Sequence, residues 1–365
     1  MARPSLNLRA LSHGVAAAFL LIMSGWILSG HLLLDKEAAK YIGCANAVLS
    51  GDLADLVGNY LKFASYVLFL VPFMAVGLPA AAALVQAVIA VLAAFAAGRL
   101  SAVFFATERA APITTVLVLL CLPLQQWVPA LYTESFFASV LLLYLERAFS
   151  KGALDRWSIA LGVVLLFTRP VGFCFVVPVV LWHLVVDRSA RYALPIVLAA
   201  SLCALLAALL VPGIPEAQLR PIAEGDVICG FPRHPGLAAK LGGSSVLSAQ
   251  QVLFTHDPVA ALLTFGERVL SLFTWPRPYF SWPHNLFLAV HYPLLVLAIV
   301  GGWRSRYAPN APPMLLGMML HVLLVGLTHD EWSGRFFVPL WPLLCVLAAG
   351  PLAGLAGRWQ RIGTR

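Results

Sequence analysis

The stretch AAAALVQAVIAVLAAFAA at residues 80–97 decides the fold class, because it stays apolar over almost the full length of a membrane crossing. A bilayer core takes about 20 helical residues per crossing. A second stretch, ITTVLVLLCLP at 113–123, has the same character, and neither alternates polar with apolar residues as a transmembrane β-strand does. Both stretches predict α-helices, since a helix satisfies its own backbone hydrogen bonds in lipid.

The whole chain shares this apolar composition. Of its 365 residues, 61% are hydrophobic and 11% are charged, whereas soluble domains carry about 25% charged residues. This composition excludes a water-soluble fold. The net charge of +8 does not indicate a nucleic-acid partner, because Lys and Arg lie in short loops and at both ends of the chain. We expect one all-α integral membrane domain over residues 1–365.

Positive residues mark the inner side of a membrane, and this rule fixes the threading. About ten transmembrane helices then fit the sequence. The crossings lie near residues 14–34, 80–98, 112–128, 134–149, 157–169, 171–186, 192–212, 285–302, 313–328 and 335–356. Both ends are inside, and the outer face receives two long loops, 35–79 and 213–284, in which we expect juxtamembrane helices.

Two apolar stretches do not fit as crossings, because a span at either one would invert every later loop. The stretch 259–275 carries Glu267 and Arg268 in its middle and predicts an amphipathic helix on the outer surface. The stretch 63–78 is interpreted as juxtamembrane or re-entrant, and whether it crosses stays open. A disulfide between Cys44 and Cys229 also stays open, since the sequence does not show their geometry.

Carboxylates follow the first span on the outer side, in Asp35-Lys36-Glu37. A carboxylate at this surface can act as the general base when a hydroxyl attacks the anomeric carbon of a lipid-linked sugar. Alternatively, these residues have no catalytic role and are simply the start of a charged loop where the span ends. Glu134 allows two readings as well: it orients a sugar hydroxyl, or it favours the N-terminus of its helix.

Four short elements, taken in order, resemble the GT-C superfamily of membrane glycosyltransferases. They are Asp35 at the end of the first span, Tyr132-Thr133-Glu134-Ser135, Phe167-Thr168-Arg169-Pro170, and GRFFVPLWP at 334–342. The second is similar to an element of the GPI-type mannosyltransferase branch, and the third resembles the Thr-Arg-Pro segment of bacterial members. The fourth resembles an Arg-Tyr-x-x-Pro-x-x-Pro pattern, with Phe336 in place of Tyr.

The resemblance implies inverting transfer of a sugar from a polyprenyl-phosphate-linked donor to a lipid or glycan acceptor on the outer face. Asp35, Glu37 and Glu134 are the expected catalytic residues, with Asp35 as the base. The expected substrate-binding residues are Tyr132, Arg169, Arg233, His284, Asn285 and Arg335. Among these, Arg169 holds the lipid phosphate through paired hydrogen bonds. Snorkelling at the interface explains Arg335 equally well and explains Arg233 better than phosphate binding does.

The aromatic segment 275–285 allows two interpretations. Its rings stack on sugar faces while His284 and Asn285 bind hydroxyls, or its Trp and Tyr residues form an interfacial belt. The acidic segment 329–331 has no compact metal-ligand spacing, so we expect neither a metal nor a cofactor.

The alternative function is a transporter or flippase of lipid-linked saccharides. It would place ionisable residues deep in several spans, where His183 and His321 are nearly the only ones. No internal repeat is visible either. The many Ala, Leu, Arg and Pro residues suit a bacterium with a GC-rich genome. We therefore expect a multi-pass protein of the bacterial inner membrane, surrounded by membrane lipids, with its active face toward the periplasm.

Overall fold

The computed structural model describes residues 7–152, 154–186, 216–243, 245–306, 308, 310–331 and 333–362. Over these ranges the regular structure is helical, and extended pairing is limited to two isolated bridges, Leu33 with Ala130 and Ile228 with Asp330. The prediction of an all-α fold is confirmed for this part of the chain. The crossing predicted at 192–212 lies outside the described residues.

Within the described ranges, three helical stretches are long and apolar enough to cross a membrane. They are α1 (Leu8–Leu28), α5 (Pro79–Phe105), and the pair α15 (Trp282–Ala289) and α16 (Tyr292–Ser305), which together cover Trp282–Ser305. The apolar stretch at 80–97 is thus helical, as predicted. Further apolar helices are 10–17 residues long, which is shorter than a full crossing of about 20 residues.

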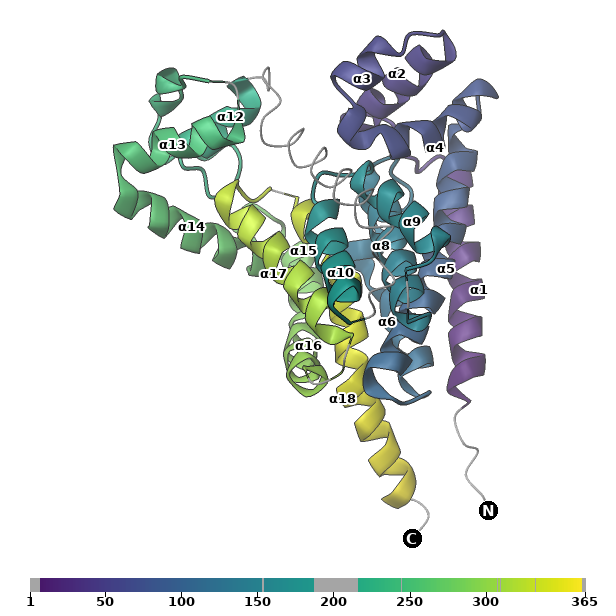
Figure 1. The fold of residues 1–365 in the computed structure, drawn as a ribbon. Coiled ribbons are helices and arrows are strands. Elements are labelled where there is room, and N and C mark those ends of the chain that lie inside the picture. Colours follow the sequence, from purple (N-terminus) through teal and green to yellow (C-terminus); the bar gives the residue numbers. More distant parts are fainter. Residues whose placement is uncertain are drawn as a thin grey trace.

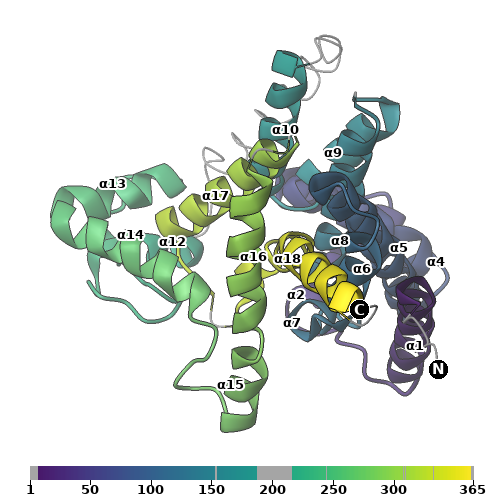
Figure 2. The ribbon, with the colours of Figure 1, turned by 90° about the horizontal axis from the view of Figure 1, so that it is seen from below.

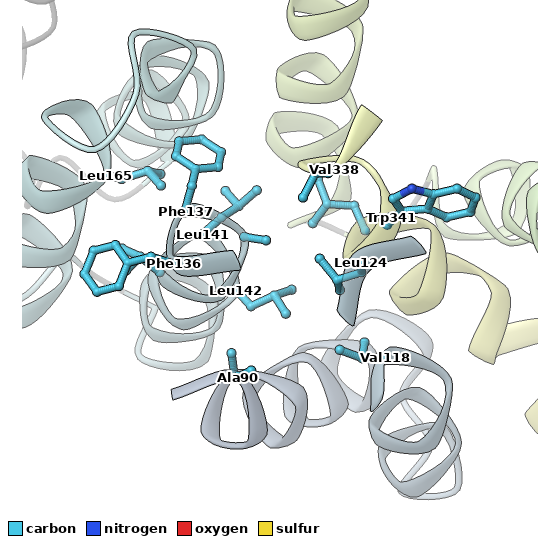
Figure 3. Packing of buried hydrophobic residues seen from close by; sticks show 14 of the residues in the cluster. Ala90, Val118, Leu124, Phe136, Phe137, Leu141, Leu142, Leu165, Val338 and Trp341 are labelled. Carbon is cyan, nitrogen blue, oxygen red and sulfur yellow. The ribbon is translucent and has the colours of Figure 1, made fainter. Parts of the chain in front are cut away.

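The core is built around α8 (Thr133–Ser150), whose side chains are buried on nearly every face. Figure 3 shows Phe137, Leu141 and Leu142 of α8 facing neighbours from several other helices. The close approach of α5 to α6 (Ala110–Leu120) depends on small residues. A Cβ on Gly98 would lie 2.6 Å from the carbonyl oxygen of Ala111, so a larger residue there would push these helices apart.

The other helices of the bundle run alongside this core (Figure 1). They are α7 (Leu122–Gln125), α9 (Arg156–Leu166), α10 (Gly172–Val186), α17 (Ala311–Leu327), η4 (Arg335–Phe337) and α18 (Trp341–Ile362). Seen from below, α18 lies between the α5, α6 and α8 group and α16 (Figure 2). The start of α1 and the end of α18 lie at the same end of the molecule, the arrangement that the loop charges predict (Figure 1).

At the opposite end, the first long loop folds into short helices. They are α2 (Glu37–Leu49), α3 (Ala54–Gly58), η1 (Leu61–Phe63) and α4 (Ala64–Ala75). The 12 residues of α4 extend about 18 Å, against about 30 Å for the hydrocarbon core. α4 alone therefore extends over only part of this thickness.

The second long loop forms a side group of helices, α12 (Glu216–Ala223), η3 (Leu237–Lys240), α13 (Val246–His256) and α14 (Pro258–Phe273) (Figure 1). The amphipathic helix expected at 259–275 is α14. Its polar side faces the protein, with Arg268 1% exposed, while Leu262 and Leu263 are exposed on the other side. Cys44 and Cys229, whose pairing the sequence leaves open, are both free thiols.

Candidate functional site

Backbone pairing brings two distant parts of the sequence together at the end of the bundle that carries α2–α4. The Leu33 N–H, just after α1, donates to the carbonyl of Pro129 at 3.2 Å. The buried amide of Gln86 on α5 holds the same segment by donating to the carbonyl of Ala130 at 3.1 Å. The acidic element that follows α1 therefore lies beside the start of α8.

Tyr132 connects these two segments through its side chain. Its phenol lies beside the backbone N–H of Glu37, at the start of α2. Burial raises the pKa of the Tyr132 phenol, and the nearby charge of Asp35 raises it further. Tyr132 thus stays protonated at neutral pH and keeps a hydroxyl proton available beside both carboxylates.

Glu134 and Arg169 form a buried ion pair. Arg169 Nη1 donates to Glu134 Oε1 at 2.9 Å, and the two side chains are 12% and 3% exposed. Pro170 disfavours continuation of α9, and the Thr168 hydroxyl donates back to the carbonyl of Val164 at 2.6 Å. Arg169 is consequently held in the turn between α9 and α10, pointing at the first turn of α8.

Tyr41 also belongs to this region, although it is not among the residues predicted from the sequence. The residue is 5% exposed on α2. Burial raises the pKa of its phenol, the charge of Glu134 adds to this effect, and the charge of Arg169 opposes it. Tyr41 lies four residues after Glu37, and this helical spacing, which places both on one face of α2, was the available signal.

Arg335 approaches the same carboxylates from the loop between α17 and α18. Its Nη1 lies 4.0 Å from Glu37, and its Nε lies 3.7 Å from Glu331. Burial lowers the pKa of Arg335, but the charges of Glu134, Glu331 and Glu37 outweigh it, so the pKa is raised. The buried Nε–H has no hydrogen-bond partner among the described residues. Arg335 is therefore positively charged at neutral pH, and within the described chain its Nε–H is available as a hydrogen-bond donor.

Asp35 occupies the exposed edge of this arrangement. Within the described chain its carboxylate forms no ion pair, in contrast to Glu134. The next residue, Lys36, has φ of +52°, a conformation that is rare outside glycine and persists where surrounding structure fixes it. This turn directs the chain from Asp35 into α2, and it leaves the Asp35 side chain accessible.

These residues form one group, the ionic cluster. Its members are Asp35, Glu37, Tyr41, Tyr132, Glu134, Arg169, Glu331 and Arg335. Six of them were candidates from the sequence. Glu331 was seen only as part of an acidic segment, and nothing local indicated that it would face Arg335.

Three further candidates do not join the ionic cluster. The Asn285 amide accepts from the N–H of Arg277 at 2.7 Å and donates to its carbonyl at 2.8 Å, so it fixes a turn. His284 stacks on Phe280 with ring centroids 4.2 Å apart. Arg233 pairs with Glu267 in the side group of helices. None of the contacts described for these three residues involves a member of the ionic cluster.

A pocket opens beside the ionic cluster and is called here the aromatic pocket. It encloses about 410 Å³, part of it open to solvent. Its lining residues are Pro123, Gln126, Leu272, Trp275, Arg277, Phe280, Leu288, Asp330, Ser333, Gly334, Phe337 and Trp341. Arg277 and Asp330 form a buried ion pair at 2.5 Å in its wall. Ser333 and Gly334 belong to the loop that carries Arg335, so the pocket and the cluster share one wall.

Comparisons with known proteins do not identify a family. No protein-family model matches the chain, and neither a curated protein nor a solved structure shows significant similarity to it. Among the described residues, no group of three or more His, Cys, Asp or Glu side chains is arranged to hold a metal ion.

Proposed function

We propose that this protein is a GT-C-type glycosyltransferase that transfers a sugar, with inversion, from a polyprenyl-phosphate donor to an acceptor hydroxyl. The observation that supports this most is the convergence of Asp35, Glu134, Arg169 and Arg335 from four separate segments at one end of the bundle. Buried charges are costly unless they are paired. A purely structural subunit has no need to gather them at one accessible place.

The membrane arrangement follows from the same proposal. The three long apolar stretches cross the bilayer, and the shorter apolar helices pack against them to complete the roughly ten crossings that the loop charges predict. The ionic cluster then lies at the outer surface. In a bacterium this is the periplasmic face of the inner membrane, where a polyprenyl-phosphate sugar is presented by the lipid.

The proposed reaction is a single displacement. The acceptor oxygen bonds to the anomeric carbon as its proton passes to Asp35, and the bond from that carbon to the phosphate oxygen breaks. The leaving polyprenyl phosphate keeps the electron pair of the broken bond. Asp35 suits the role of base because its carboxylate is exposed and not engaged in an ion pair within the described chain.

The two arginines have different parts in this proposal. Arg169 already donates to Glu134, so it carries less unused hydrogen-bonding capacity. Arg335 is the principal group for the departing phosphate, because its ionic contacts are long and its Nε–H has no hydrogen-bond partner in the described part of the chain. A preorganised cation stabilises the charge that develops on a leaving group. Glu134 positions Arg169, and Tyr41 and Tyr132 supply hydroxyl protons nearby.

The test is transfer by the purified protein in lipid nanodiscs, from a panel of radiolabelled polyprenyl-phosphate sugars to lipid and glycan acceptors. Arg335→Gln should lower the rate about 100-fold or more, since one charge-stabilising donor contributes that much in other enzymes. Arg109→Gln, at an exposed position in an inner loop, should transfer normally. Normal transfer by Arg335→Gln would contradict the assignment. Movement of the donor across sealed vesicles without transfer would favour a flippase.

A further inference from the structure

We infer that the aromatic pocket binds the acceptor, and that it binds it as a neutral, hydroxylated pyranose ring. The acceptor is then a glycan or glycolipid whose terminal sugar receives the transferred unit. This inference rests on the proposed function, because the pocket is called an acceptor site only if transfer takes place beside it.

The first support is the lining of aromatic rings. Trp275, Phe280, Phe337 and Trp341 all face the pocket, and the ring centroids of Trp275 and Trp341 are 4.4 Å apart. Such rings offer rigid apolar surface beside polar groups. A pyranose has a matching form, since its C–H face is apolar and its hydroxyls point outward. Pockets of this mixed kind are typical small-molecule sites.

The second support is the charge balance of the polar groups in the wall. Arg277 and Asp330 are 7% and 1% exposed and neutralise each other, and the Ser271 hydroxyl donates to Asp330 at 2.8 Å. A phosphate or ammonium group gains no net attraction from such a pair. Hydroxyl groups, which both donate and accept, can use its remaining hydrogen-bonding positions. The wall therefore favours a neutral sugar over a charged headgroup.

The third support is an unsatisfied donor. The buried indole N–H of Trp275 has no hydrogen-bond partner among the described residues. Buried polar groups in proteins are nearly always hydrogen-bonded, so an orphan group requires an explanation. An occupant with hydroxyl oxygens is the kind of ligand that supplies the missing acceptor.

The position of the pocket connects it to the reaction. The loop between α17 and α18 gives Asp330, Ser333 and Gly334 to the pocket, and Glu331 and Arg335 to the ionic cluster. A ring held in the pocket would present its hydroxyls along this shared wall. A charged donor at the ionic cluster and a neutral acceptor in the aromatic pocket would then occupy adjacent sites of different electrostatic character.

The experiment measures binding without catalysis. Saturation-transfer NMR is recorded with methyl pyranosides of different configuration and the full-length protein in nanodiscs. We expect saturable, millimolar binding of at least one pyranoside, about tenfold weaker in Phe280→Ala because one ring contact is lost. Gln126→Trp, which places bulk in the pocket at an exposed lining position, provides a second weakened variant. Trp282→Ala removes an exposed aromatic residue that does not line the pocket, and it should bind normally.

Absence of saturable binding in the wild type would overturn the inference, as would equal binding by Phe280→Ala and Gln126→Trp. Glu134→Gln separates the two proposals, since it should bind the pyranoside while losing transfer. If no donor is ever turned over but the binding pattern holds, the proposed function fails and the sugar site stands. If transfer proceeds equally well in Phe280→Ala to acceptors without a sugar, the pocket assignment fails and the proposed function stands.

Discussion

The buried ion pair of Glu134 with Arg169 allows a quantitative test of the ionic cluster. At a separation of 2.9 Å, with an effective dielectric constant of about 20, Coulomb attraction amounts to about 6 kcal/mol. Desolvation of both groups offsets much of this gain. Removal of one partner leaves the other charge buried and unpaired, which typically costs about 3–5 kcal/mol.

Glu134→Gln and Arg169→Gln should therefore each lower the free energy of unfolding by about 3 kcal/mol or more. The double variant should cost clearly less than the sum of the two, because it leaves no unpaired charge from this pair. The assay is unfolding of the protein by SDS titration in mixed micelles, followed by tryptophan fluorescence.

The matched control is Glu108→Gln. Glu108 pairs with Arg9 at 3.4 Å, but these side chains are 82% and 75% exposed, so the loss of this pair should have little measurable effect. Additive effects of Glu134→Gln and Arg169→Gln, or losses no larger than that of Glu108→Gln, would refute the buried pairing.

Three other predictions concern stability and use the same unfolding assay. Asp330→Asn should cost about 3–5 kcal/mol, because it leaves the Arg277 guanidinium buried without its counter-charge; a loss below about 1 kcal/mol would contradict this. Gly301→Ala should cost about 1–3 kcal/mol by forcing a methyl group against the backbone of α18, whereas Gly302→Ala should not, because its Cβ would lie 3.8 Å from Leu347 and 3.9 Å from Leu315, at ordinary contact distance. Burial lowers the pKa of His329, so its contribution to stability is complete above the unfolded-state pKa of about 6.5 and is lost as the pH falls below it. A melting temperature measured at about pH 8 and about pH 5 should fall on acidification, and less so in His329→Gln.

Much of the helical architecture could be predicted from local pattern alone. The uniform apolar run of α5 and the two-sided pattern of α14 each identify a helix without tertiary information. The orientation of α14 is harder to predict, because the sequence does not reveal which of its two faces packs against the protein. Arg268 is buried against the carbonyl of Asp226 at 2.6 Å, a contact between residues far apart in the chain.

In the candidate site, too, some residues could be predicted from local sequence and others only from tertiary contacts. The sequence predicts Asp35, Glu134, Arg169 and Arg335 from short elements at the ends of spans, which together resemble the GT-C superfamily. Asn285 was a reasonable candidate, but its amide is fully used by the turn beside it.

The residues that sequence reasoning missed depend on long-range contacts. Glu331 became relevant only through its approach to Arg335, and Asp330 only through its pairing with Arg277. Such pairings depend on helix packing and leave no local signal.

The measurement that tests the central claim most directly is sugar transfer by Asp35→Asn. This substitution keeps the shape of the side chain and removes the base. Asp52→Asn, in the same outer loop, is the control: the Asp52 carboxylate accepts from the Ala54 N–H at 3.0 Å, a turn-forming bond that an Asn side chain also makes. We predict that Asp35→Asn transfers at least about 100-fold more slowly than the wild type while Asp52→Asn transfers normally. Undiminished transfer by Asp35→Asn would contradict the account.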